Sequence, residues 1–142
     1  MFHKKHSPYA DRLRSLARFD GLSDADLTRI ADRGTHLTSP AGWSLMAEGT
    51  PADKAYLLLD GEASVRMHGE EIARLGTGDF LGEVALVTHG LRTASVVSTT
   101  PLELIHFTAE AVAELSEQIP QFARALEETA RDRLAHDRGS DA

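Results

Sequence analysis

The sequence predicts an α+β domain in which helices flank a small β barrel or sandwich. Between residues 35 and 107, seven turn signals separate short apolar or alternating runs, a pattern typical of strands of about five or six residues. Before and after this region, apolar residues recur at helical spacing instead. The 142 residues, of which 42% are hydrophobic, suffice for one domain whose core needs no metal or disulfide.

Two helices are expected ahead of the strands. Apolar residues at helical spacing predict a short amphipathic helix over residues 9–18. Ser23 is a suitable N-cap and is followed three residues later by Asp26, which predicts the start of a second helix. Gly34 stands where a C′ glycine would end that helix.

Six runs between the turn signals are expected to be strands. The dipeptide Asp60-Gly61, which separates two of these runs, is the strongest hairpin signal in the chain. Trp43, at the start of the first run, is expected to be a packing aromatic. The six runs are residues 43–46, 55–59, 63–67, 71–75, 93–98 and 102–107.

Two further helices are expected after the strands. Thr108 can cap the first of them. Pro120 suits the first position of the second, because a proline there gives up only an N–H group that has no partner within the helix. This last helix is predicted to end near His136 and to be followed by a frayed tail. Its apolar stripe, expected to be core or a dimer contact, consists of Phe122, Leu126, Ala130 and Leu134.

Composition and charge exclude several classes of protein. The chain has no cysteine, which excludes disulfide scaffolds, thiolate zinc sites and cysteine nucleophiles. Its net charge of −7 argues against a free-standing DNA-binding protein, which usually carries a basic face. No apolar run approaches the roughly 18 residues of a membrane span, and the start is not a secretory signal. We therefore expect a cytoplasmic protein that binds neither DNA nor a membrane.

The histidines and the known catalytic motifs give little support for an enzyme. The seven histidines are scattered, and the H-x-H pattern of a cupin metal site does not occur. No P-loop, H-E-x-x-H or serine-hydrolase motif is visible in the sequence either. We therefore predict no catalytic activity and no metal.

One segment does not fit a simple succession of strands. Residues 83–88 are predicted to form one or two helical turns inserted between strands, bounded by Gly82 and Gly90. The first N–H groups of such a helix have no internal partner and favour an anion. Gly82 would let a ligand approach the backbone, and the small side chains of Ala85 and Ala94 would keep the site shallow. The segment therefore resembles an anion pocket.

Two charged residues of this segment narrow the class of ligand. Arg92 offers a planar fork of donors that matches two oxygens of a phosphate. Glu83 would repel a phosphate, but it could accept a hydrogen bond from a sugar hydroxyl. Together they indicate a ribonucleotide. The alternatives are that Glu83 is an acid favoured by the start of a helix, and that Arg92 pairs with Glu83 alone.

One short run reads Gly82-Glu83-Val84-Ala85-Leu86, and a second run, five residues later, reads Arg92-Thr93-Ala94-Ser95-Val96. Together the two runs resemble the phosphate-binding cassette of the cyclic nucleotide-binding domain family. This domain occurs in regulatory subunits of cAMP-dependent kinase, the bacterial catabolite activator protein and cyclic-nucleotide-gated channels. The resemblance covers residues 16–136 and departs from the family pattern at Leu91, where proline is frequent. It implies an eight-stranded jelly-roll (double-stranded β-helix) barrel flanked by N-terminal helices and two C-terminal helices, with residues 1–15 as an extension and residues 137–142 as a flexible tail.

The resemblance also implies a role for each matching residue. Glu83 would accept the ribose 2′-OH, and Arg92 would pair with the cyclic phosphate. The cradle around the phosphate would include Gly82, Val84, Ala85 and Ala94. Thr93 does not settle the choice of base, because threonine occurs at this position in receptors for cAMP and for cGMP. The residues expected against the base are Val65 and Leu75, which are otherwise ordinary strand residues, and the possible lids are Phe122, Leu126 and Arg131.

Two functions follow from these expectations. The first is a stand-alone cytoplasmic receptor for cAMP or cGMP that signals when its C-terminal helix closes, with an effector protein or a second copy of the chain as partner. The second is a ligand-free interaction or dimerisation module with the same fold. No helix-turn-helix is expected to follow the last helix, so the resemblance to the catabolite activator carries no DNA binding with it.

Overall fold

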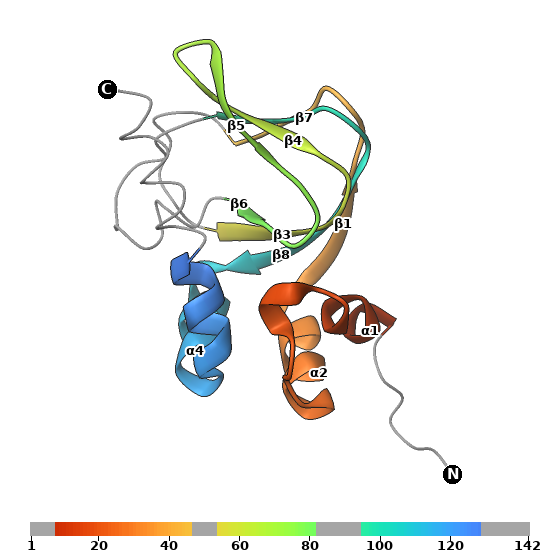
Figure 1. Ribbon diagram of the computed structural model, residues 1–142, viewed down its shortest axis with the longest axis vertical. Coiled ribbons are helices and arrows are strands. Elements are labelled where there is room, and N and C mark those ends of the chain that lie inside the picture. The colour runs from red at the N-terminus through yellow and green to blue at the C-terminus, as the bar shows by residue number, and fades with distance from the viewer. Residues whose placement is uncertain (1–7, 47–53, 82–94, 129–142) are drawn as a thin grey trace.

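The protein, represented by a computed structural model, is described here over residues 8–46, 54–81 and 95–128 (Figure 1). Its strands form two four-stranded antiparallel sheets, with the orders β1-β8-β3-β6 and β2-β7-β4-β5. We call the first the helix-side sheet, because in Figure 1 it lies between the helices and the second sheet, which we call the outer sheet. The strands are β1 (Thr35–Ser39), β2 (Ser44–Met46), β3 (Lys54–Asp60), β4 (Ala63–Met67), β5 (Glu70–Leu75), β6 (Phe80–Leu81), β7 (Ser95–Ser98) and β8 (Leu102–Thr108).

This architecture confirms the predicted α+β class and the jelly-roll barrel. Each predicted run contains a strand whose described bounds differ from the prediction by no more than two residues. Two strands were not among the predicted runs. β1 has the sequence THLTS with one aliphatic residue, and β6 has only two residues, so neither produces a recognisable pattern.

The predicted hairpin at Asp60-Gly61 is wrong. β3 pairs with β6 and β8, whereas β4 pairs with β5 and β7, so this turn carries the chain from one sheet to the other. Gly61 has φ +106°, and a Cβ there would lie 2.5 Å from the carbonyl oxygen of Pro101. The two-residue hairpin is instead His68-Gly69, which joins β4 to β5. Both residues have positive φ, as the tightest hairpin turns require.

The helix predicted over residues 9–18 divides into two pieces, α1 (Pro8–Arg14) and the 3₁₀ helix η1 (Ala17–Phe19). At the end of α1, the N–H groups of Ser15 and Leu16 donate to carbonyl oxygens three residues back, at 3.3 and 3.1 Å. Bonds of this type tighten and end a helix. The separate η1 brings Phe19, which is 1% exposed, into the core.

The second predicted helix is α2 (Asp24–Arg33), and its cap is confirmed. The hydroxyl of Ser23 accepts a hydrogen bond from the N–H of Asp26 at 3.1 Å. The helix ends at Gly34 as predicted, and the φ of Gly34 is −107°, outside the left-handed region. Glycine is required there by close packing, since a Cβ would lie 2.2 Å from Cγ2 of Ile105 and 2.9 Å from Cε1 of Phe107.

The helices after the strands begin as predicted. The hydroxyl of Thr108 accepts from the N–H of Ala111 at 3.0 Å at the start of α4 (Ala109–Gln118). A further helix begins at Pro120 and occupies residues 120–128 of the described chain. Its predicted end near His136 lies outside the described residues. Phe122 and Leu126 are buried, which confirms that this part of the apolar stripe belongs to the core.

The two faces of the helix-side sheet bury two separate sets of side chains. Along β3, Leu57 belongs to the core against the helices and Leu58 to the core inside the barrel, and both are fully buried. We call these the helix-side core and the barrel-interior core. Trp43 belongs to neither. Its side chain is 58% exposed, so the expectation that it is a packing aromatic is wrong.

Candidate functional site

Of the predicted ligand-binding residues, two lie in the described part of the chain. Val65 is in β4 and Leu75 is the last residue of β5, and both belong to the barrel-interior core. The side chains are almost fully buried, with 1% and 6% of their surface exposed. The predicted residues outside the described part are Gly82, Glu83, Val84, Ala85, Arg92, Thr93 and Ala94, and the possible lid Arg131 lies outside it as well.

The strands next to the predicted cassette connect it to both sheets. β6 ends at Leu81, which pairs with Tyr56 of β3 in the helix-side sheet. β7 begins at Ser95 in the outer sheet, and its Val96 pairs with Val65. The predicted wall residue Val65 is therefore the direct strand neighbour of a residue two positions beyond Ala94.

The turn that leads into β6 is held firmly on β3. Asp79 closes the turn twice, because its N–H donates to the carbonyl oxygen of Gly76 at 3.0 Å and its Oδ2 accepts from the N–H of Gly76 at 2.9 Å. The N–H of Gly78 donates to the carbonyl oxygen of Leu58 at 2.8 Å. In return, the N–H of Leu58 donates to the carbonyl oxygen of Asp79 at 2.9 Å. The backbone entering the cassette region therefore has a defined position on the sheet.

Polar contacts stabilise the β4–β5 hairpin that carries Val65 and Leu75. The hydroxyl of Ser64 donates to Oε1 of Glu71 at 2.7 Å, and Nε of Arg74 donates to Oε2 of the same carboxylate at 3.1 Å. The hydrogen bond from Ser64, followed by that from Arg74, lowers the pKa of Glu71 below its ordinary value. At the turn, Nη2 of Arg66 donates to the carbonyl oxygen of Gly69 at 3.0 Å.

An aromatic pair on the barrel-interior side was missed by the sequence prediction. The rings of Tyr56 and His106 lie 5.6 Å apart between centroids, and the two residues are register partners on β3 and β8. Tyr56 belongs to the barrel-interior core and also pairs with Leu81, the last described residue before the cassette. This places a phenol and an imidazole side by side on the face of β3 and β8 that lines the barrel interior. The apolar run around Tyr56 could not indicate which face the ring occupies.

Two of the possible lids lie in the helix-side core. The ring of Phe122 stacks on Phe19 at 6.3 Å between centroids and meets Phe80 and Phe107 edge to face at 5.6 and 5.8 Å. Leu126 belongs to the same core. Both side chains therefore pack on the opposite face of the helix-side sheet from Val65 and Leu75.

Residues 8–46, 54–81 and 95–128 contain no group of three or more histidine, aspartate or glutamate side chains that could hold a metal ion. Among their helices, none has both the length and the apolar character to cross a membrane.

A family model and two curated relatives agree on the family to which this chain is similar. The model of the cyclic nucleotide-binding domain matches residues 37–119. Over 90 residues the chain is 37% identical to the human potassium/sodium hyperpolarization-activated cyclic nucleotide-gated channel 4, covering 63% of this chain and 8% of the channel. Over 100 residues it is 34% identical to the type II regulatory subunit of cAMP-dependent protein kinase from Drosophila melanogaster, covering 68% of this chain and 26% of the subunit. The chain thus corresponds to a small part of each of these relatives.

A solved structure supports the same fold. The regulatory subunit of a cAMP-independent protein kinase A from Trypanosoma brucei superposes with a TM-score of 0.81 at 18% identity, covering 94% of this chain and 48% of that chain. At this identity the likeness concerns the fold alone. These comparisons confirm the family to which the sequence motif pointed.

Proposed function

The chain belongs to the cyclic nucleotide-binding domain family, and we propose that it is a receptor domain for cAMP or cGMP. The observation that carries this proposal is the pair of motifs at residues 82–86 and 92–96, which keep both an acid and an arginine within the matched segment. The two curated relatives are named as a cyclic nucleotide-gated channel and a cAMP-dependent kinase subunit, which supports the same class of ligand.

In this proposal the two charged residues bind opposite ends of the nucleotide. The Arg92 guanidinium pairs with the cyclic phosphate, because its planar fork matches two phosphate oxygens. The Glu83 carboxylate accepts a hydrogen bond from the ribose 2′-OH. The base lies against Val65 and Leu75, whose burial and common position in the barrel-interior core support an apolar wall.

The signal proposed for this domain is a shift between two conformations. A nucleotide that binds better to the state with the C-terminal helix closed raises the population of that state. The closed helix then contacts an effector protein or a second copy of the chain. That the chain acts as a stand-alone cytoplasmic receptor without a metal stays a prediction.

The second candidate function is an interaction module that binds no nucleotide. The Trypanosoma brucei structure supports keeping this alternative, because a protein of the same fold is described there as part of a cAMP-independent kinase. The two functions differ in whether the chain takes up cAMP or cGMP at all.

Isothermal titration calorimetry with cAMP and with cGMP separates the two functions. We expect the wild type to bind at least one nucleotide and Arg92→Leu to lose about 2–5 kcal/mol of binding free energy, the usual cost of removing one partner of a buried charge pair. Arg33→Leu is the matched control, because Arg33 lies on α2 in an exposed ion pair with Glu114. Its affinity should equal that of the wild type. A wild type that gives no heat with either nucleotide would favour the interaction module.

A further inference from the structure

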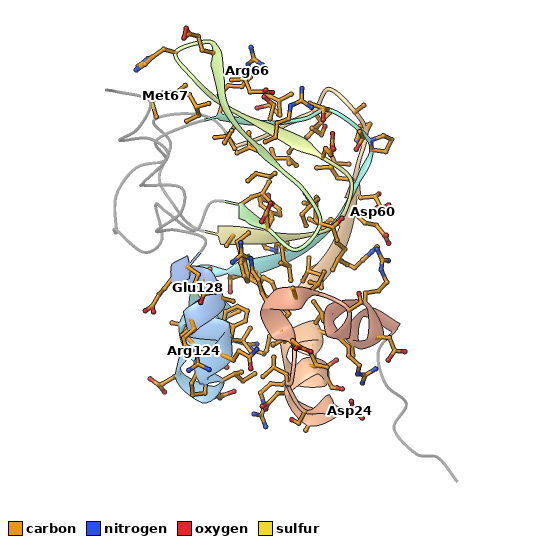
Figure 2. All side chains as sticks on the ribbon, in the orientation of Figure 1. Asp24, Asp60, Arg66, Met67, Arg124 and Glu128 are labelled. Carbon is orange, nitrogen blue, oxygen red and sulfur yellow. The ribbon has the colours of Figure 1, made fainter. Side chains whose placement is uncertain are left out.

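Arg18, in η1, lies between two carboxylates that come from distant parts of the chain. Its Nη2 is 3.4 Å from Oδ1 of Asp79, in the turn before β6. Its Nη1 is 3.8 Å from Oε1 of Glu128, in the helix at residues 120–128. Figure 2 shows Glu128 at the end of this helix nearer the sheets, while Arg124 lies farther from them. One guanidinium therefore connects three segments of the fold.

The helix at residues 120–128 also holds the backbone around Arg18. Nε2 of Gln121 donates to the carbonyl oxygen of Arg18 at 3.0 Å and to that of Asp20 at 2.9 Å. Phe19, the residue between Arg18 and Asp20 in the sequence, stacks its ring on that of Phe122. Polar and apolar contacts thus make η1 and this helix one packed unit.

The turn before β6 is attached to this unit in two ways. The Asp79 carboxylate binds Arg18 through Oδ1 and the N–H of Gly76 through Oδ2, so the same group closes the turn and contacts η1. The next residue, Phe80, meets Phe122 edge to face with ring centroids 5.6 Å apart. Only Leu81 then separates these contacts from residue 82, the first residue of the predicted cassette.

We propose that Arg18 is a positioning residue that couples the entrance of the nucleotide-binding cassette to the helix at residues 120–128. The nucleotide part of this inference rests on the proposed function. A planar guanidinium can bind a carboxylate on each side, which a lysine ammonium does less well. The side chains of Arg18 and Asp79 are only 25% and 30% exposed, so solvent screens this pair less than a fully exposed one. The link continues from the same guanidinium to Glu128 through a contact that is longer, at 3.8 Å, and to a side chain that is 54% exposed. A displacement of Asp79 is expected to reach Glu128 along this path.

The pair formed by Arg33 and Glu114 provides a control within the same molecule. It joins α2 to α4 at 2.9 Å, with side chains 41% and 44% exposed. It is an ion pair between helices, like that of Arg18 and Glu128, but neither residue belongs to the turn before β6 or to the helix at residues 120–128. Arg33→Gln should therefore loosen α2 and α4 without affecting the cassette entrance.

The first experiment measures amide hydrogen exchange in the full chain without nucleotide. In Arg18→Gln we expect exchange to rise roughly threefold, the scale of one ion pair, both in residues 121–128 and in residues 76–81. In Arg33→Gln both segments should exchange as in the wild type. A rise confined to residues around position 18 would overturn the proposal, because the two distant segments would then not depend on this contact.

The second experiment measures how cAMP, or cGMP if the chain prefers it, changes exchange in residues 121–128. In the wild type we expect the nucleotide to protect this helix, and in Arg18→Gln we expect at least half of that protection to be lost while binding persists. Asp79→Asn, which keeps an acceptor for Gly76, should have a similar effect, and the double variant should be no worse than either single variant. Such non-additivity is typical of two residues that act through one contact.

The two experiments separate the possible failures. Full nucleotide-induced protection in Arg18→Gln, or strictly additive effects in the double variant, would overturn the coupling role. If the wild type binds neither nucleotide, the proposed function fails instead. The exchange measurement without nucleotide then still decides whether Arg18 links the two segments.

Discussion

The two faces of the helix-side sheet are built from different side chains. The face against the helices buries four phenylalanines, Phe19, Phe80, Phe107 and Phe122, whose rings form one connected cluster. The face inside the barrel is mainly aliphatic and adds the ring pair of Tyr56 and His106. The helix-side sheet thus supports a large aromatic core on one face, and its other face packs against Val65 and Leu75 of the outer sheet, the proposed wall of the ligand site.

This difference leads to different expectations for substitutions in the two cores. The aromatic cluster contains residues from η1, β6, β8 and the helix at residues 120–128, so it holds η1 and this helix to the barrel. The barrel-interior core brings together Val65 and Leu75 with residues next to the predicted cassette. We therefore expect substitutions in the first core to act mainly on stability and coupling, and substitutions in the second to act on nucleotide affinity as well.

The largest effect is expected from Phe122→Ala, in the centre of the aromatic cluster. Phe122 is fully buried against three other rings, so its loss leaves a cavity that the neighbours cannot fill. Chemical denaturation should show a loss of about 3–5 kcal/mol in the free energy of unfolding. The conservative Phe122→Leu should lose less. A loss below about 1 kcal/mol for Phe122→Ala, well under that range, would show that the helix at residues 120–128 is not part of the core.

The next prediction compares two neighbours in β3 that face opposite cores. Leu57 and Leu58 are both fully buried, and replacing either by alanine should cost about 2–5 kcal/mol of unfolding free energy. Because Leu58 belongs to the barrel-interior core, Leu58→Ala should also weaken nucleotide binding by calorimetry, whereas Leu57→Ala should leave the affinity close to that of the wild type. Equal affinities for the two variants would contradict the division between the faces.

A smaller effect is expected from Gly34→Ala, where α2 meets β8 on the helix side. The added methyl group would overlap Ile105 and Phe107, and such overpacking typically costs about 1–3 kcal/mol. Gly76→Ala is the control, because its Cβ would meet no heavy atom within 4 Å. Thermal unfolding should show a clearly lower midpoint for the first variant alone. Equal midpoints would mean that the contact between Gly34 and β8 is not maintained in solution.

The smallest effect concerns the acid sensitivity of the attachment of α1. Glu103, on β8, accepts from Nε2 of His36 on β1 at 2.9 Å and pairs with Nη1 of Arg12 on α1 at 2.8 Å. The hydrogen bond from His36, followed by that from Arg12, holds the pKa of Glu103 below its ordinary value of 4.5.

This lowered pKa fixes the direction of the pH dependence. The carboxylate of Glu103 stabilises the folded state at pH values above about 4.5, and this contribution is lost as the pH falls through the lower pKa of the folded state. Urea unfolding between pH 6 and pH 3, in roughly half-unit steps across this window, should therefore show a steeper fall for the wild type than for Glu103→Gln. Identical slopes would contradict this assignment.

Local signals in the sequence predicted much of the fold, and the wrong hairpin at Asp60-Gly61 shows what such signals do not contain. The caps at Ser23 and Thr108 act within a few residues and were confirmed. The hairpin predicted at Asp60-Gly61 is wrong because β3 pairs with β6 and β8, which lie farther along the chain. A turn motif describes the bend of the backbone but not which strands then pair.

The same distinction applies to the candidate site. The cassette motif is a contiguous pattern and could be identified from the residues alone. The contact of Arg18 with Asp79 joins residues 61 positions apart, and no local pattern around either of them indicates it. The ring pair of Tyr56 and His106 likewise depends on the register of β3 and β8. Such contacts are created by tertiary packing and become visible only in the structure.

The claim that the nucleotide lies against the barrel-interior side is tested most directly by nuclear Overhauser effects between the bound nucleotide and methyl groups of the protein. With methyl-labelled leucine and valine, we predict contacts from the base protons to Val65 and Leu75, and none to Leu57 on the opposite face of the sheet. A bound nucleotide whose base protons contact helix-side methyl groups, and neither Val65 nor Leu75, would contradict it.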